Sequence, residues 1–268
     1  MKKPLILLPP SEGKAVGGSG PAFTDGSISF PELDADRRRV AAALAAAMDD
    51  DALAAKLLGV KGAALESARA ANRAVLSAPT QPAILRYTGV LYDAFDYPSL
   101  SPAIKKRAAQ QVVIFSGLWG AVRAGDPIPH YKLKMGASLA GLGKLNTFWK
   151  PSLTAALAPL VDGQAVWDLL PNEHVAAWNP EPGSLRTRIS VKFVDEATDP
   201  STGQRKRSVV NHWNKLLKGA LVRHVLETQL SDHDGLARFE HPLGYVYDPA
   251  LTTEARGVTR VTLIAQRD

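Results

Sequence analysis

Short apolar runs alternate along this chain with longer stretches in which apolar residues recur at helical spacing. The apolar runs predict buried strands at residues 5–8, 112–115 and 165–169. The helical spacing predicts helices at residues 31–47, 52–58, 63–76, 103–111 and 148–157. Because strands and helices alternate, we expect an α/β fold in which helices cover a sheet.

The last third of the chain has a different pattern, with longer strands and fewer helices. It predicts strands at 186–194 and 204–210 around a turn at 199–203, a helix at 213–226, and closing strands at 245–247 and 258–265. We therefore predict a mixed sheet within one domain over residues 1–268. A helical module at residues 31–80 is inserted into this domain.

Composition fits a folded protein with a substantial core, since 46% of the 268 residues are hydrophobic and 22% are charged. No apolar run reaches the length of about 18 residues that a membrane span needs, and the first apolar stretch ends at Pro9 and Pro10. We expect a cytoplasmic protein without a signal peptide or membrane segment. The absence of cysteine excludes disulfides, thiolate chemistry and cysteine-ligated metals.

The chain is basic, with a formal net charge of +6 and an isoelectric point of about 9.5. This balance favours a polyanionic partner or an anionic substrate. The histidines lack the spacing of metal ligands, so neither a metal nor another cofactor is expected.

A four-residue turn made of Gly59, Val60, Lys61 and Gly62 separates two of the predicted helices. It resembles the helix-hairpin-helix element of DNA-repair proteins, in which backbone N–H groups of the turn contact a phosphate without reading sequence. The alternative is an ordinary pair of helices, in which Gly59 ends one helix and Gly62 begins the next.

The loop after the first predicted strand contains Ser11, Glu12, Gly13 and Lys14, which suggests an anion site. It is not a phosphate-binding P-loop, because the upstream glycine is missing and Ala15 follows the lysine. A solvated glycine-rich loop is the alternative. Ser11 could also act as a nucleophile and Glu12 as a general base, although no histidine lies near them in sequence.

Basic residues are concentrated in two further segments. The first contains Arg123, Lys132 and Lys134, and alternation along a strand would place the two lysines on one face. The second contains Arg207, Lys215 and Lys218, with the two lysines one helical turn apart. If both segments line one cleft, their charges would follow a phosphate backbone. If the segments lie apart, their charges would serve only to keep the protein soluble.

Three other residues are candidates for chemistry. Tyr92 is the tyrosine that we expect to face a pocket. Glu173 and His174 follow a predicted strand, where open α/β sheets often place functional side chains, although His174 could equally cap a helix.

Several of these segments together resemble the YaaA (peroxide stress protein) family. The resemblance covers about residues 4–247 and rests on separated motifs that occur in the family's order: residues 8–14 (LPPSEGK), 115–120 (FSGLWG), 131–136 (YKLKMG) and 172–173 (NE). Two positions depart from the family pattern: Lys132 replaces the usual arginine, and Asp93 replaces a small polar residue. Lysine keeps the charge at position 132 but loses the planar fork that binds phosphate in a bidentate manner.

The resemblance implies a cytoplasmic protein of the peroxide stress response that limits iron-dependent oxidative DNA damage and is associated with lowered free iron. It implies non-specific binding of double-stranded DNA through a positively charged cleft, and we expect a monomer. The alternative is an enzyme that acts on a nucleobase or nucleotide in the same cleft, with proton transfers by Ser11, Glu12, Tyr92, Glu173 or His174.

Overall fold

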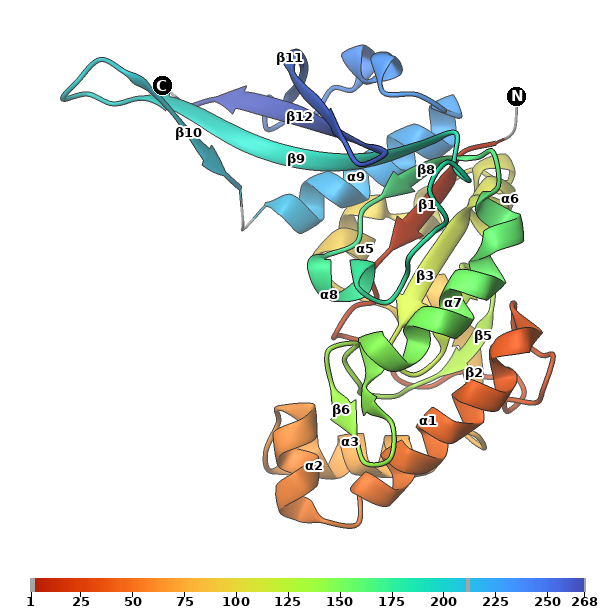
Figure 1. The fold of residues 1–268 in the computed structure, drawn as a ribbon. Helices are drawn as coiled ribbons and strands as arrows, with labels where there is room; N and C mark the ends of the chain where they lie inside the picture. Colours follow the sequence, from red (N-terminus) through yellow and green to blue (C-terminus); the bar gives the residue numbers. More distant parts are fainter. Residues whose placement is uncertain (1–2, 211–212, 268) are drawn as a thin grey trace.

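The computed structural model describes residues 3–210 and 213–267 and shows a mixed sheet with helices packed on both faces (Figure 1). The strands of the main sheet are β1 (Leu5–Leu8), β3 (Val112–Ser116), β4 (Gly120–Arg123), β8 (Ala165–Asp168), β9 (Thr187–Thr198), β10 (Arg205–Val209), β11 (Val246–Ala255) and β12 (Val258–Gln266). Within the described residues these eight strands have the order β11-β12-β9-β8-β1-β3-β4, and β10 pairs with β9. The central strands are parallel, while β4, β10 and β11 are antiparallel to their neighbours.

The helices are α1 (Asp34–Ala47), α2 (Asp51–Leu58), α3 (Ala63–Arg73), α4 (Ala83–Arg86), α5 (Val90–Phe95), α6 (Pro102–Gln111), α7 (Leu145–Val161), α8 (Asn172–Val175) and α9 (Asn214–Thr228). Two small ribbons pair β2 (Thr80–Pro82) with β5 (Pro127–Pro129) and β6 (Ser138–Leu139) with β7 (Gly143–Lys144). Helices α1, α2 and α3 lie together beyond one end of the main sheet (Figure 1).

The mixed α/β fold and most of the predicted elements are confirmed. The strand at residues 5–8 coincides with β1, and the helices predicted at 52–58 and 103–111 coincide with α2 and α6 to within a residue. Helices α4 and α5 were not predicted, because four to six residues give too little periodicity to recognise.

The strand expected through Lys132 and Lys134 is wrong. Strand β5 ends at Pro129, and residues 130–134 have no regular secondary structure. Proline has no N–H to donate to a strand ladder. The backbone of Lys132 instead pairs with the side chain of Asn72 on α3, with two hydrogen bonds of 2.9 Å.

Strand β1 lies between β3 and β8, and all three run parallel. The chain leaves β1 towards β3 on one side and later returns to β8 on the other. Right-handed crossovers therefore place α6 and α7 on opposite faces of the sheet, as Figure 1 shows. The carboxyl ends of β1 and β8 meet where the strand order reverses, which is where open α/β sheets bind ligands.

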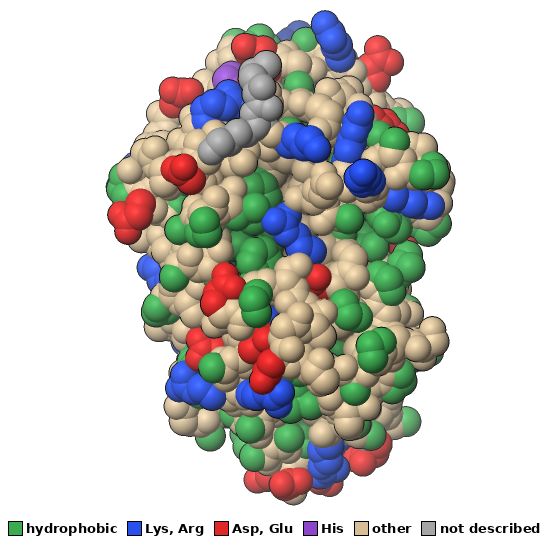
Figure 2. Space-filling view, turned by 90° about the vertical axis from the view of Figure 1, so that its right-hand side faces the viewer, with side chains coloured by type: hydrophobic (Ala, Val, Ile, Leu, Met, Phe, Trp, Pro, Cys, Tyr) green, Lys and Arg blue, Asp and Glu red, His purple; other side chains and the backbone are tan. Residues whose placement is uncertain are grey.

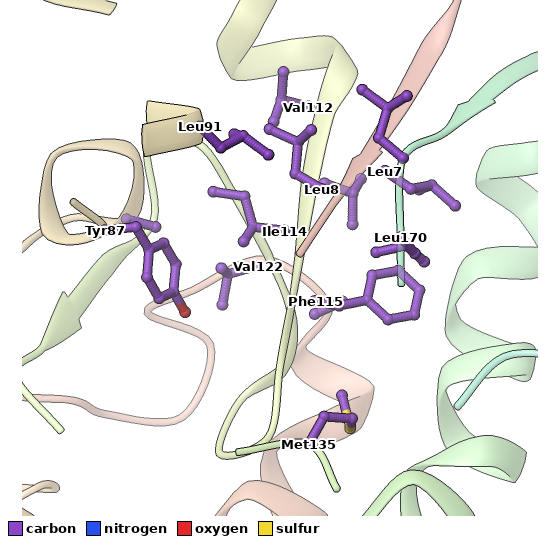
Figure 3. Packing of buried hydrophobic residues seen from close by; sticks show 14 of the residues in the cluster. Leu7, Leu8, Tyr87, Leu91, Val112, Ile114, Phe115, Val122, Met135 and Leu170 are labelled. Carbon is purple, nitrogen blue, oxygen red and sulfur yellow. The ribbon is translucent and has the colours of Figure 1, made fainter. Parts of the chain in front are cut away.

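The core is a continuous cluster of buried apolar side chains that extends to these carboxyl ends. Figure 3 shows Leu8, Ile114 and Val122 on neighbouring strands, with Tyr87 to one side and Met135 below. Tyr87 and Met135 are 2% and 0% exposed, although neither belongs to a strand or helix. Loop residues therefore complete the core beneath the point where the strand order reverses.

A buried arginine joins α1 to the sheet. The guanidinium of Arg37, which is 0% exposed, donates 2.6 Å to the carboxylate of Asp34 and 2.7 Å to the carbonyl of Ser29. It also donates to the carbonyls of Trp119 and Ala121, at 3.1 and 2.9 Å. The helical module is thereby held to the strand β4 region by hydrogen bonds to a fully buried charge.

We predict that Arg37→Met lowers the free energy of unfolding by about 3–5 kcal/mol, because it leaves a buried carboxylate and three carbonyls without their donor. The matched control is Arg38→Met, since Arg38 is half exposed and pairs with Asp25 at the surface; it should cost less than about 1 kcal/mol. Urea unfolding of both variants measures the difference. Equal losses would show that Arg37 does not anchor the module.

Candidate functional site

A cavity of about 60 Å³ lies at the carboxyl ends of β1 and β8. Its lining comes from three segments: the loop after β1, the irregular segment after β5, and helix α8 after β8. The lining residues are Pro10, Ser11, Glu12, Lys14, Lys132, Leu133, Lys134, Met135, Glu173 and His174. The fold thus brings together candidates that are up to 163 positions apart, since the set runs from Ser11 to His174.

The loop after β1 is held by backbone pairing with the chain around α4. Ala15 N–H donates to the Arg86 carbonyl at 2.8 Å, and Thr88 N–H donates to the Gly13 carbonyl at 3.1 Å. The buried guanidinium of Arg86 donates to the carbonyls of Ala15 and Gly17. The loop is therefore a fixed strap, not the flexible glycine-rich loop that its sequence also allows.

Lys14 extends its amine from this strap over two aromatic rings. Its Nζ donates 2.9 Å to the Ser11 carbonyl and lies 4.3 Å from the ring centroid of Tyr131 and 5.4 Å from that of Tyr87. No carboxylate of the described residues forms an ion pair with it. Burial, followed by the positive charge of Lys132, lowers the pKa of Lys14 to about 7.

Beneath Lys14 the two tyrosines belong to a buried chain of hydroxyl groups. The Tyr131 hydroxyl is 2.8 Å from that of Tyr87 and 2.7 Å from that of Ser116. The Ser116 oxygen in turn accepts N–H bonds from Leu118 and Trp119. Burial raises the pKa of Tyr131 to about 12, so these hydroxyls are neutral and give Lys14 no negative partner.

Glu12 is surrounded by lysines. Its carboxylate accepts a 3.0 Å ion pair from Lys134 Nζ. The hydrogen bond from Lys134 holds the pKa of Glu12 below its usual range, and the charges of Lys132 and Lys215 act in the same direction. Glu12 is therefore an ionised carboxylate that is paired with Lys134 and lies within the electrostatic influence of Lys132 and of Lys215 on α9.

Helix α8 supplies Glu173 and His174. A side chain at Gly136 would place a Cβ 2.8 Å from Glu173 Oε2, so the glycine leaves room for this carboxylate. His174 is 4% exposed, and neither ring nitrogen has a hydrogen-bond partner among the described residues. Burial lowers the pKa of His174 to about 4, so the ring is neutral at physiological pH.

A wider groove of about 560 Å³ adjoins the cavity and shares Lys134 and Glu173 with it. One wall is α2 and the glycine after it, and the other is the segment at residues 134–138. The remaining lining residues are Leu53, Lys56, Leu57, Leu58, Gly59, Gly136, Ala137 and Ser138. The helical module therefore faces the cavity across a groove.

The turn between α2 and α3 has the backbone that its glycines predict. Gly59 and Gly62 have φ values of 66° and 57°, in the region that favours glycine. The Gly59 N–H closes α2 by bonding to the Ala55 carbonyl at 2.9 Å. The N–H groups of Val60, Lys61 and Gly62 find no acceptor in the described part of the chain.

Four predicted residues lie elsewhere or are engaged internally. Tyr92 is buried and donates 2.8 Å to the Pro9 carbonyl, and Lys218 donates 2.9 Å to the Leu169 carbonyl, so both support the loops of the site. Arg123 pairs in register with Val113 at the opposite end of β3 from the cavity. Arg207 lies on β10, where its guanidinium bonds to the buried carboxylate of Glu196 at 2.7 Å.

The face drawn in Figure 2, on the side of the N-terminus, carries side chains of both signs. The positive net charge therefore does not make this face a uniformly basic surface. Lys132, Lys134 and Lys215 are instead grouped by their common influence on Glu12.

Sequence reasoning missed the residues that support the site. Arg86, Tyr87 and Asn72 act through buried hydrogen bonds to distant segments, and no motif around them announces these contacts. Among the described residues, no three His, Asp or Glu side chains gather as metal ligands would. None of the described helices combines the length and apolar character of a membrane span.

His174 generates a pH prediction. Its folded pKa of about 4 lies below its usual value of 6.5, so the unfolded chain binds more protons between these values and stability falls as pH decreases through this window. From pH 7.5 to pH 5 the loss attributable to His174 is about 2 kcal/mol. Urea unfolding of the wild type and of His174→Leu at both pH values should show a correspondingly smaller loss in the variant. Equal losses of stability in the two proteins would show that His174 does not cause this pH dependence.

Comparison with known proteins assigns this chain to a family. Residues 5–251 match the family described as peroxide stress protein YaaA. A UPF0246 protein of Streptomyces coelicolor is 41% identical over 225 residues, which cover 84% of this chain and 83% of the relative. UPF0246 proteins of Corynebacterium efficiens and Corynebacterium glutamicum are 40% and 37% identical, covering 82% and 86% of this chain and 83% and 88% of their own. The chain therefore belongs to the peroxide stress protein YaaA family.

Proposed function

We propose that the groove and the cavity beside it bind the backbone of double-stranded DNA without strong sequence preference. The observation that carries this proposal is that Lys132 and Lys134 line one cavity with the exposed carboxylate of Glu12, whose pKa is lowered by their charges and by that of Lys215, next to a groove of about 560 Å³. Three cations around a single Glu12 leave an excess of positive charge. Such a local excess favours phosphate groups and the release of their counterions.

The turn across the groove supplies a second kind of contact. The N–H groups of Val60, Lys61 and Gly62 have no acceptor in the described chain, and Lys61 is exposed. Backbone donors of this kind bind phosphate oxygens without reading the bases. The turn would hold one stretch of backbone in helix-hairpin-helix manner, while the lysines contact another.

Fewer basic residues contact DNA in this proposal than the basic composition of the chain suggests. Arg123 lies at the far edge of the sheet, Arg207 is paired with Glu196, and the Lys218 amine is bonded within the protein. These three residues are outside the proposed path. Lys14 lines the adjoining cavity and is partly buried, so it would meet only a group that enters there.

DNA binding offers a physical route to protection during peroxide stress. Lysines that neutralise phosphates displace the cations condensed on DNA. Ferrous ions are among the cations that can occupy these positions, and their displacement moves iron-dependent radical formation away from the duplex. We propose that the protein limits iron-dependent oxidative DNA damage in this way.

We predict that Lys132→Ala and Lys215→Ala each weaken duplex binding and reduce the slope of log K against log salt by about one unit, because each removes one phosphate contact. Fluorescence anisotropy across a salt series measures both quantities. The matched control is Lys106→Ala, which removes the same charge from an exposed position on α6. A slope unchanged in both test variants, or reduced equally in the control, would refute the contact set.

One observation favours a second candidate, an enzyme that acts on a nucleobase or nucleotide in the same cleft. The buried ring nitrogens of His174 have no hydrogen-bond partner in the described chain, with Nδ1 3.5 Å from Glu173 Oε1, and Glu12 and Glu173 line the same cavity. Polar groups left unpaired in this way gain most from a ligand that hydrogen-bonds to them.

For this candidate we predict that free nucleotides bind the wild type and that His174→Leu weakens this binding at least about tenfold, the loss expected when a hydrogen bond to the ligand is removed. Isothermal titration calorimetry at low salt measures both. Binding that is equal in the two proteins would remove His174 from a ligand site.

A further inference from the structure

Lys14 differs from the other lysines of the cavity in what surrounds its amine. Lys134 has a carboxylate partner at 3.0 Å, whereas the Lys14 amine has one carbonyl contact and two neutral aromatic rings. It nevertheless lines the cavity. A lysine held in this way gains less from being charged than an ion-paired lysine does, because cation–π contacts take the place of a carboxylate. It presents its amine to whatever enters the cavity.

The charged and titratable groups around Lys14 come from every segment that lines the cavity, and they include Lys134 of the segment after β5 and Glu173 and His174 of α8. On the strap and α4 side these are Glu12, which favours the charged amine, and Arg86, which disfavours it. From the segment after β5, Lys132 also disfavours the charge, and the pKa of His130 is itself lowered by burial and then by Lys14. Tyr87 and Tyr131 lie below and are neutral.

The consequence is a supply of reactive amine near neutral pH. Burial lowers the pKa of Lys14 to about 7, so its amine carries a lone pair near neutral pH far more often than that of an ordinary lysine, for which the fraction at pH 7 is roughly one in 3,000. An unprotonated lysine amine attacks carbonyl carbon and forms a Schiff base.

The surroundings restrict which carbonyl compound can reach the amine. The cavity of about 60 Å³ is small and opens beside a groove that we propose binds a phosphate backbone. A whole base pair cannot enter so small a space, so only the aldehyde end of a sugar that lacks its base could reach the amine from the groove. The open-chain form of a base-free deoxyribose carries an aldehyde at C1′ and remains attached to phosphates on both sides.

We propose that Lys14 is the amine nucleophile of a lyase activity towards base-free sites in DNA. This inference rests on the proposed DNA binding and adds to it a substrate and a chemical step. The Lys14 amine, the ionised Glu12 and the lysines along the groove would act together on one nucleotide.

The step balances with water as its only co-reactant. The Lys14 lone pair attacks C1′ of the aldehyde, one proton is taken from solvent, the oxygen leaves as water, and a protonated imine forms. The Glu12 carboxylate takes a proton from C2′, and the electron pair of that C–H bond expels the 3′-phosphate as the C3′–O3′ bond breaks. Water then hydrolyses the imine, which releases the unsaturated aldehyde on the 5′ fragment and restores the amine.

The experiment is reductive trapping. Full-length protein is incubated with a duplex that contains one base-free site, in the presence of sodium cyanoborohydride, and adducts are resolved on denaturing gels. We expect a one-to-one adduct attached at Lys14 in peptide maps, and Lys14→Arg should lose at least about tenfold of it because a guanidinium does not form the imine. The trapping rate should rise between pH 6 and 8 with a midpoint near 7, where the amine loses its proton.

Lys106→Arg is the matched control, because it makes the same replacement of an amine by a guanidinium at an exposed position on α6, outside the groove and the cavity. Lys106→Arg should trap as well as the wild type. Lys14→Gln is a second test variant, since a neutral side chain avoids placing a larger buried charge at this position. Adduct formation in Lys14→Arg and Lys14→Gln equal to that of the wild type would overturn the assignment.

Anisotropy with the same duplex, without reductant, separates the two proposals. Binding without an adduct overturns the lyase and leaves the DNA proposal standing, whereas an absence of binding removes the DNA proposal and the lyase with it. Trapping of free deoxyribose 5-phosphate but not of the duplex would overturn DNA as the source of the aldehyde. Adduct on the duplex, lost only in the Lys14 variants, supports the lyase.

Discussion

The geometry of the candidate site depends on the way buried Arg86 holds the loop after β1. Its guanidinium donates to carbonyls at Ala15 and Gly17, and the backbone of α4 pairs with the same loop. A buried guanidinium is stable only when its N–H groups have acceptors. The two carbonyls of the loop therefore hold the arginine in place, and the arginine in turn holds the loop. The positions of Ser11, Glu12 and Lys14 follow from this mutual constraint.

Strand order supplies the second half of the site. Because β1 lies between β3 and β8 and runs parallel to both, the loops that leave β1 and β8 emerge at one edge of the sheet. Gly136, which lacks a Cβ, admits the Glu173 carboxylate from α8 into the same space. The helical module then closes the outer side of the groove, and buried Arg37 ties that module to the sheet.

Much of the fold could be predicted from the sequence because its signals are local. Alternating apolar runs and helical spacing placed β1, α2 and α6 to within a residue. The candidate site residues could also be found from short stretches of sequence, because lysines, carboxylates and glycines are residue types that form anion sites. What could not be predicted is which of these residues share a space. Arg123 and Lys132 belong to one motif, yet strand reversal at β4 separates them, while Glu12 and Glu173 line one cavity at the carboxyl ends of β1 and β8.

The protonation states in the cavity explain why Lys14 is better suited to chemistry than to holding phosphate. A lysine that serves as a point charge performs best when solvated or paired, as Lys134 and exposed Lys215 are. Lys14 is instead desolvated over neutral hydroxyls, beside another lysine that disfavours its charge. Such an arrangement weakens electrostatic binding and favours an uncharged amine, which is the form that nucleophilic chemistry uses. Phosphate approaching the groove would be held by the outer lysines, which leaves the inner amine available for a carbonyl carbon.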